Sequence, residues 1–458
     1  MIWVWMLAIA ASGLGGASAK AAPAAATAEP VEAGPLRGLE TAKATVEAEI
    51  SRASSAAGEA SGGGAPTGSA EPPSGASVPE QAAPTEAPPT AITEPPAETA
   101  IQPPAASLSS ESPTCNLYAS VNGNNAGSGS AAAPLRTISA LLARLRPGQT
   151  GCLASGQTFN ENVSITDANS HGAPGEPVTL TSVEPLTPAR INGRVVTETG
   201  ADWLTFSHLD FTFSQHSPPS ITVGSIHTSW IYDDITAPKT TCFDLISSPT
   251  WGVARRTLIE HDRIHGCGAQ ETFLCNQNIP LCETPPNDGF FIHGLYIGGG
   301  RTTTVRNNYF YGNADRAVQM RSGAAGVVVE HNIMDGNGEG IIFGDGAGNA
   351  KVQWNIITNS RSRCGELTGC YDYGASEYRA GLSNLLAHND VYGNQCALAT
   401  PRCWPNVGNI ESMDRVTVEQ NIEVNPLYVN SAAGNYSLKA GSPALGYGPD
   451  TAQPGYTP

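Results

Sequence analysis

Three polar residues with complementary chemistry recur at a fixed spacing in the second half of the chain. His293 opens the segment HGLYIGG, Arg316 opens RAVQMRSG and Glu339 opens EGIIFGDG, so both gaps are 23 residues. An imidazole can remove a proton, a guanidinium can stabilise the negative charge that results, and a carboxyl group can exchange a proton. If these segments are strands of successive stacked coils, the three side chains lie in one row, about 4.8 Å apart. The spacing therefore predicts a candidate catalytic row.

Further polar residues accompany this row. Tyr296 and Gln319 lie further along the same strands and are expected to point outward, and Arg321 follows two positions beyond Gln319. Carboxylates occupy four nearby positions: Asp288, Asp315, Glu339 and Asp345. Carboxylates in pairs serve as acid and base, and clustered carboxylates bind Ca²⁺, so Asp315 and Asp345 are candidate Ca²⁺ ligands.

The row depends on a repeat that occupies much of the chain. In each copy a short β-rich run leads to Asn or Asp, as in VVVEHNIMDGNG with Asn332 and AKVQWNIITNS with Asn355. The copies, with a weaker first one, place their key residue at Leu209, Asp233, Asp262, Asn308, Asn332, Asn355, Asn389 and Asn421. The gaps are 24, 29, 46, 24, 23, 34 and 32 residues. The gap of 46 is either two coils of 23 or one coil with a long insertion.

The residue types of the repeat indicate a β-solenoid. Apolar residues alternate with polar ones over three to five positions, which predicts short, half-buried strands. Asn and Asp tolerate the left-handed backbone conformation, and stacked amides would form a ladder at the bend. A β-propeller or a leucine-rich repeat would need a different period or pattern. A predicted helix from about Leu135 to Arg146, apolar along one face, would cap the N-terminal end of the stack.

Ten cysteines, an even number, indicate disulfides. Three pairs are close in sequence, and each belongs to an insertion that we expect along one wall, at about 266–291, 360–381 and 395–414. These pairs are Cys275 with Cys282, Cys364 with Cys370, and Cys396 with Cys403; Cys115 with Cys152 and Cys242 with Cys267 would then pair by elimination. A zinc site is the alternative, but the chain has no C-x-x-C motif.

The N-terminal quarter of the chain has a different composition. Residues 1–19 are apolar and uncharged and end in Ala17-Ser18-Ala19, which predicts a signal peptide and export; an uncleaved anchor or a misplaced start codon are the alternatives. Residues 20–114 are rich in Ala, Pro, Glu and Ser, which predicts a disordered spacer. With 24 basic and 41 acidic residues the formal charge is −17, so nucleic acid and anionic lipid are unfavourable partners.

From Asn116 to about Gly448 the chain resembles the pectate-lyase-like superfamily of right-handed parallel β-helix proteins. YASVNGNNAGSGSAAAPLRT is similar to the N-terminal capping unit, NNYFYGNADRAVQMRSG and HNIMDGNGEGIIFGDG to central coils, and NPLYVNSAAGNYSLKAGSPALGYG to a closing coil. The resemblance implies an all-β solenoid over residues 115–458. The superfamily includes lyases, hydrolases, epimerases and adhesins. The G-H-G motif of polygalacturonases and the W-x-D-H motif of pectate lyases are absent.

Together with the predicted signal peptide, the resemblance implies a secreted or cell-surface protein, expected to be a monomer, that cleaves a polysaccharide in a cleft along one face. In a lyase, His293 would be the base, and Arg316 or Arg321 would clamp the carboxylate of the sugar. In a hydrolase, two of the four carboxylates named above would flank the glycosidic bond. An anionic polysaccharide would need Ca²⁺ or a basic patch on so acidic a protein. Tyr296, Gln319, Asp288 and Asp315 are candidate substrate-binding residues.

Three alternatives remain open on the sequence alone. The chain could be a non-catalytic carbohydrate-binding or adhesive protein, or a structural component of the cell envelope. The row itself could be a solvated salt-bridge ladder, with Tyr296 an ordinary half-exposed aromatic residue.

Overall fold

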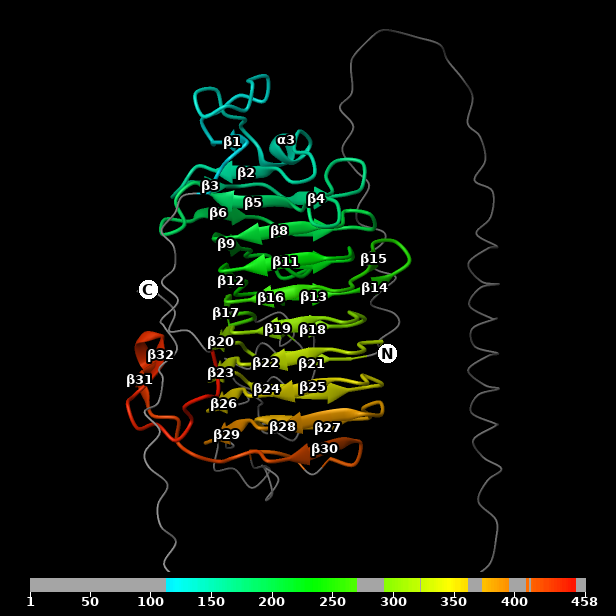
Figure 1. The fold of residues 1–458 in the computed structure, drawn as a ribbon, viewed down its shortest axis with the longest axis vertical. Helices are drawn as coiled ribbons and strands as arrows, with labels where there is room; N and C mark the ends of the chain where they lie inside the picture. Colours follow the sequence, from blue (N-terminus) through cyan, green and yellow to red (C-terminus); the bar gives the residue numbers. More distant parts are fainter. Residues whose placement is uncertain are drawn as a thin grey trace, which may run out of the picture. The chain divides into compact units, whose positions relative to one another are not determined.

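The strands form where short apolar runs alternate with polar residues, and each coil of the chain contributes strands to three parallel sheets (Figure 1). The computed structural model describes residues 113–269, 292–321, 323–360, 373–394, 409–411 and 413–449. Within these residues, all pairings between neighbouring strands of the three large sheets are parallel. This arrangement is the right-handed parallel β-helix that the repeat and the resemblance predicted.

The first sheet contains eleven strands of the described part of the chain. They are β1 (Leu117–Ala119), β2 (Thr150–Leu153), β5 (Val178–Ser182), β8 (Leu204–Ser207), β11 (Thr228–Ile231), β16 (Leu258–Glu260), β19 (Thr304–Arg306), β22 (Val328–Glu330), β25 (Lys351–Gln353), β28 (Asn384–Ala387) and β30 (Val416–Glu419). β16 pairs directly with β19, so the gap of 46 residues is one coil with a long insertion.

The other two large sheets follow the same coil order. The eight-stranded sheet consists of β4 (Val163–Ile165), β7 (Val195–Thr197), β10 (Ile221–Val223), β13 (Phe243–Leu245), β18 (Leu295–Ile297), β21 (Arg316–Met320), β24 (Glu339–Gly344) and β27 (Ala375–Tyr378). The nine-stranded sheet consists of β3 (Thr158–Phe159), β6 (Ala189–Asn192), β9 (Leu209–Thr212), β12 (Asp234–Thr236), β17 (Arg263–His265), β20 (Tyr309–Tyr311), β23 (Ile333–Asp335), β26 (Ile356–Thr358) and β29 (Asp390–Tyr392). A short antiparallel pair joins β14 (Ser247–Ser248) to β15 (Gly252–Val253).

The predicted Asn/Asp ladder is present. From Leu209 to Asn389, the backbone N–H of each ladder residue donates to the side-chain oxygen of the ladder residue one coil further on, at 2.7–3.0 Å. One detail of the prediction was wrong, because the left-handed residue is the one before each ladder residue, as at His331 (φ 54°) and Trp354 (φ 58°). The preceding residue makes the bend, and the ladder amide is thereby directed into the stack.

The bends are covered by stacked rings. Trp354 and His388 stack with their centroids 4.4 Å apart, and Tyr232 stacks on His261 at 4.6 Å. These contacts lie between consecutive coils, where aromatic stacking adds to the burial of apolar surface. Trp354 therefore packs the turn beside Asn355.

The N-terminal helix is shorter than predicted. α3 spans Ile138–Leu142, with Thr137 as its N-cap, because Leu135 is bonded instead to Tyr118 as an extended residue. Beyond Leu142 the N–H groups of Arg144 and Leu145 bond to carbonyls three residues back, before the Pro147-Gly148 stop. The apolar residues of the predicted face are nevertheless buried, as expected for a cap: Leu135, Ile138, Leu141, Leu142 and Leu145.

The C-terminal segment does not form the predicted closing coil. β31 (Tyr428–Asn430), the 3-10 turn η2 (Ser431–Ala433) and β32 (Asn435–Leu438) make an antiparallel hairpin beside the nine-stranded sheet (Figure 1). Tyr436 of the hairpin joins Tyr309, Ile333 and Ile356 in an apolar cluster separate from the main core. The outward apolar residues of β20, β23 and β26 explain the difference, because the hairpin buries them.

Two of the predicted disulfides lie in the described residues. Cys115 is bonded to Cys152 and Cys242 to Cys267, as the pairing by elimination predicted. The other six cysteines, Cys275, Cys282, Cys364, Cys370, Cys396 and Cys403, lie outside the described residues. No helix in the described ranges is long and apolar enough to cross a membrane.

Candidate functional site

The structure brings His293, Arg316 and Glu339 together at the beginning of three neighbouring strands of the eight-stranded sheet. Arg316 pairs with Glu339 in the register of β21 and β24, and Leu295 pairs with Val318, which places His293 opposite Arg316. The coils between them contain 23 residues and no long insertion, so the sequence spacing translates directly into this register.

A chain of polar and ionic contacts connects the row. The Oδ2 atom of Asp315 lies 3.3 Å from Nδ1 of His293 and 2.8 Å from Nη1 of Arg316. On the other side, Nε of Arg316 lies 2.7 Å from Oε2 of Glu339. The hydroxyl of Ser376 donates to the second oxygen of Glu339. The row is therefore one network, in which Asp315 holds both the imidazole and the guanidinium.

The network is enclosed. The side chains of His293, Arg316 and Glu339 expose only 4%, 7% and 1% of their surface, and that of Asp315 exposes 10%. The salt bridges of the row are therefore buried, not solvated as in the ladder that the sequence left open. Buried charges are stable only when they are paired. Removal of one member of the network would therefore leave its partner buried as an unpaired charge.

Burial moves the proton affinities of two members of the network. It lowers the pKa of His293 well below 6.5, and the charges of Arg316 and Arg321 lower that pKa further. Burial raises the pKa of Glu339 to about 7, which the Arg316 guanidinium and the Ser376 hydroxyl only partly offset. At neutral pH the imidazole is thus uncharged and able to accept a proton, while the Glu339 carboxyl is close to half protonated.

Glu339→Gln should flatten the pH dependence of stability. The folded pKa of Glu339 is about 7 against an ordinary 4.5, so the folded state holds the proton more tightly than the unfolded state. This stabilisation is complete below about pH 4.5 and is lost as pH rises through about 7, by about 3 kcal/mol at most. Urea unfolding of both proteins across this range should give a stability difference that changes with pH. A stability difference that stays the same at every pH would contradict the raised pKa of Glu339.

Tyr296 and Arg321 lie beside the enclosed network. Tyr296 alternates with the core residues Leu295 and Ile297, so it points outward as predicted, and its ring lies 5.5 Å from that of His293 in a stacked arrangement. Burial raises the pKa of Tyr296, which keeps the phenol protonated. Arg321 leaves 24% of its side chain exposed, and its Nε lies 3.7 Å from Oδ2 of Asp345.

The remaining predicted residues have different surroundings. Gln319 pairs with Tyr296 in the same outward row and is buried, at 4% exposure. Asp288 lies outside the described residues. Ser376 was not predicted, because an insertion separates it from Glu339 by 37 residues and hides its coil position. Asp244 was not predicted either; it pairs with Tyr296 on the neighbouring strand, and burial raises its pKa to about 7.

The two predicted Ca²⁺ ligands do not come together. Asp315 precedes β21 and contacts His293 and Arg316, whereas Asp345 follows β24 and faces Arg321. These strands are paired in register, so Asp315 and Asp345 lie at opposite ends, seven positions or roughly 20 Å apart along the strand. Within the described ranges no group of three His, Cys, Asp or Glu side chains is arranged to hold a metal ion. The described residues therefore do not fit the predicted Ca²⁺ site.

The three parallel sheets and their coil-by-coil register define a right-handed parallel β-helix, the fold of the pectate-lyase-like superfamily that the sequence resembles. No family model and no curated protein sequence matches the chain. Among solved structures, pectate lyase Pel9A is similar at 14% identity and a TM-score of 0.47, over 71% of this chain and 90% of its own.

Two further solved structures are similar at comparable levels. An alginate lyase from Paenibacillus sp. str. FPU-7 is 14% identical with a TM-score of 0.39, over 62% of this chain and 95% of its own. A rhamnogalacturonan lyase is 9% identical with a TM-score of 0.43, over 72% of this chain and 99% of its own.

Proposed function

We propose that this chain is an exported polysaccharide lyase that acts on an acidic polysaccharide at the outer side of β18, β21 and β24. The observation that carries the proposal is the surroundings of His293, whose uncharged imidazole lies against Asp315, beside the Tyr296 phenol and close to the positive charge of Arg321. A base, an acid and a cation next to one another are the groups that a β-elimination requires.

Each group has a definite part in the proposed reaction. Asp315 faces Nδ1 of His293 and favours the tautomer that carries its proton there, which leaves the lone pair of Nε2 as the base. Nε2 removes the proton on the carbon next to the sugar carboxylate. The electrons of that C–H bond form a carbon–carbon double bond, and the glycosidic C–O bond breaks. The departing oxygen takes the phenolic proton of Tyr296, which the imidazolium then replaces.

Arg321 would neutralise the carboxylate of the sugar. Its side chain is only partly buried, and its contact with Asp345 is long, at 3.7 Å. Replacing the Asp345 carboxylate at Arg321 by that of the sugar would therefore cost little free energy, since an exposed ion pair contributes about 0 to 1 kcal/mol. The positive charge of Arg321 would also allow a chain with a net charge of −17 to bind an anionic polymer.

Elimination is favoured over hydrolysis because the carboxylates of the network are already engaged. Asp315 contacts His293 and Arg316, and Glu339 contacts Arg316 and Ser376. A hydrolase needs two carboxyl groups that flank the glycosidic bond, one as acid and one as base or nucleophile. Neither carboxyl group in this network is positioned as an independent member of such a pair.

A non-catalytic carbohydrate-binding protein is the second candidate. The burial of the row favours it, since the His293 side chain exposes only 4% of its surface and the network could serve to fix the strands. The two disulfides fit an oxidising compartment and therefore suit export under either proposal.

Incubation of the purified chain with a panel of uronate and neutral polysaccharides separates the candidates. A lyase produces unsaturated products that absorb in the ultraviolet, whereas a hydrolase produces reducing ends without that absorbance. Retention on a polysaccharide column without any product would support the binding protein instead. We expect ultraviolet-absorbing products from at least one uronate polymer and from no neutral polymer.

A further inference from the structure

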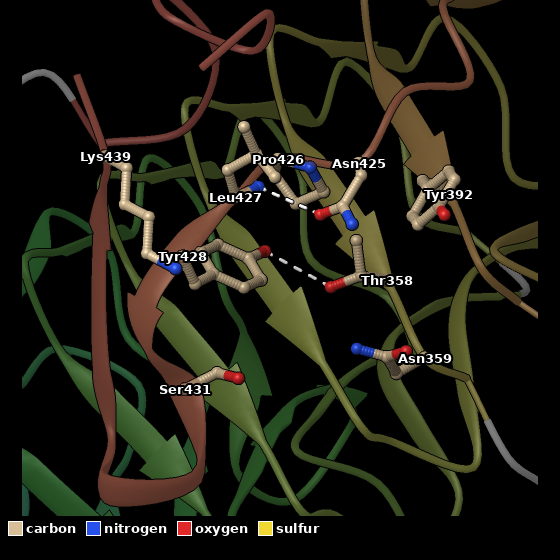
Figure 2. Close-up of a pocket in the computed structure, with 9 residues that line it drawn as sticks. All are labelled: Thr358, Asn359, Tyr392, Asn425, Pro426, Leu427, Tyr428, Ser431 and Lys439. Atoms are coloured by element: carbon tan, nitrogen blue, oxygen red, sulfur yellow. Dashed lines mark hydrogen bonds between the residues drawn. The ribbon is translucent and has the colours of Figure 1, made fainter. Parts of the chain in front are cut away.

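A pocket of about 310 Å³ lies on a different face of the solenoid, between the C-terminal hairpin and the nine-stranded sheet (Figure 2). Its walls come from the ends of β26 and β29, from the segment before β31, and from the hairpin itself. The lining residues are Thr358, Asn359, Tyr392, Asn425, Pro426, Leu427, Tyr428, Ser431 and Lys439. None of them belongs to the candidate catalytic row.

The hairpin wall of this pocket is held in place by tyrosines. The hydroxyl groups of Tyr428 and Thr358 lie 3.2 Å apart, and the Tyr428 ring packs edge-on against Tyr436 at 5.3 Å. Tyr436 in turn lies against Tyr309 and Tyr311 of β20, with centroids 6.0 and 5.7 Å apart. These contacts tie the hairpin to the sheet, so the pocket is part of the folded structure and needs no rearrangement to form.

On the opposite wall of the pocket, the polar side chains are held in position by residues that lie behind them. Oδ1 of Asp335 accepts hydrogen bonds from Oγ1 of Thr358 and Nδ2 of Asn359, both at 2.7 Å. At the upper edge, Oδ1 of Asn425 accepts the Leu427 N–H at 3.0 Å, so the amide nitrogen of Asn425 faces the pocket (Figure 2). Side chains fixed in this way offer hydrogen bonds at defined positions, which is how small polar ligands are recognised.

The pocket combines one positive side chain in its lining with a carboxylate, that of Asp335, behind its wall. Lys439 is exposed and is the one charged residue among the nine that line the pocket, whereas the whole chain carries −17. Hydroxyl and amide groups suit a ligand rich in hydroxyls, and the lysine adds a preference for a carboxylate. Tyr392, 37% exposed, offers a ring face to the apolar side of a sugar. A pocket of about 310 Å³ is at the small end of ligand sites, the size for one sugar unit.

We propose that this pocket binds one uronate unit of an acidic polysaccharide, with Lys439 pairing with its carboxylate and Tyr392 flanking its ring. The site is separate from the row at His293 and does not depend on elimination there. If both proposals hold, the second site would keep a long polymer attached while its other segments reach the eight-stranded sheet, because linked contacts raise the local concentration of the chain.

The test uses methyl hexuronosides and the matching neutral methyl hexosides as probes. These single sugars contain no bond between sugar units, so their binding is measured whether or not the protein cleaves polymers. Titrations are followed by calorimetry or by NMR in an Arg321→Met background, which removes the other proposed carboxylate contact. We expect Lys439→Met to weaken hexuronoside binding by on the order of tenfold or more, because a charged hydrogen bond is lost.

Two further variants keep this test decisive. Lys351→Met removes an exposed lysine from β25 of another sheet and should leave hexuronoside binding unchanged. Tyr392→Ala should weaken binding of the same probe while the folded state, followed by circular dichroism, is retained. Equal affinity of the Lys439→Met protein and its parent would overturn the proposal. Hexosides that bind as tightly as hexuronosides, or an absence of hexuronoside binding, would overturn it as well.

Discussion

Asn332→Ala should lower the free energy of unfolding by about 3 to 5 kcal/mol. Nδ2 of Asn332 donates to the carbonyls of Val305 and Glu330 and to Oδ1 of Asn355, each at 2.9 Å. Its Oδ1 accepts the backbone N–H of Asn308 at 2.9 Å. Alanine would leave these groups buried without their partner, and each unsatisfied group costs about 1 to 3 kcal/mol. Urea denaturation of the purified protein gives the change directly.

The matched control for this variant is Asn122→Ala. Asn122 is exposed in a turn near the N-terminal cap and lies outside the ladder, so its replacement should change stability by no more than about 0.5 kcal/mol. A loss at Asn332 as small as that at Asn122 would mean that the ladder contributes little to the fold. A loss of several kcal/mol at both sites would point to a general effect of Asn replacement instead.

His293→Gln should reduce the proposed elimination by roughly 10²- to 10⁴-fold, the usual contribution of a positioned general base. Glutamine keeps much of the size and polarity of histidine but cannot take a proton at neutral pH. The wild-type reaction should also persist in mildly acidic buffer, because burial lowers the pKa of His293 well below 6.5. Initial rates of ultraviolet absorbance with a uronate polymer, at a series of pH values, measure both effects.

His265→Gln is the control for the catalytic variant. His265 lies on the nine-stranded sheet, is 27% exposed in its side chain and contacts Asp234 at 2.9 Å, so it is a paired histidine away from the proposed site. Its replacement should leave the rate within about twofold. Comparable losses in both variants, or a His293→Gln protein as active as wild type while circular dichroism shows both folded, would remove His293 from the mechanism.

The scaffold could be predicted from the sequence because its main constraint is local and repeated. Each coil needs a side-chain amide or carboxylate at one bend, so Asn332, Asn355 and their counterparts recur in recognisable surroundings. The same regularity placed His293, Arg316 and Glu339 in one register, since no insertion separates these coils. Where the period is interrupted, as before Ser376, the coil position is hidden and the residue was missed.

Other features depend on contacts between distant segments. The left-handed residue of each bend is not marked by type, since His331, Trp354 and Gln420 all adopt it. The burial of the row and the part played by Asp315 between His293 and Arg316 follow from side-chain packing, which spacing does not reveal. The C-terminal hairpin and its pocket arise because Tyr428 and Tyr436 find tyrosines on β20 and a hydroxyl on β26, more than 60 residues earlier.

The central claim, that this β-helix cleaves an acidic polysaccharide by elimination, is tested most directly by mass spectrometry of products formed in water enriched in oxygen-18. Elimination adds no water, so the account predicts unsaturated oligosaccharides whose newly formed ends carry no label from the cleavage step when the spectra are taken before slow exchange. Saturated products with one oxygen-18 at the cleaved bond would show hydrolysis and contradict the account. An absence of products from every uronate polymer would contradict it equally.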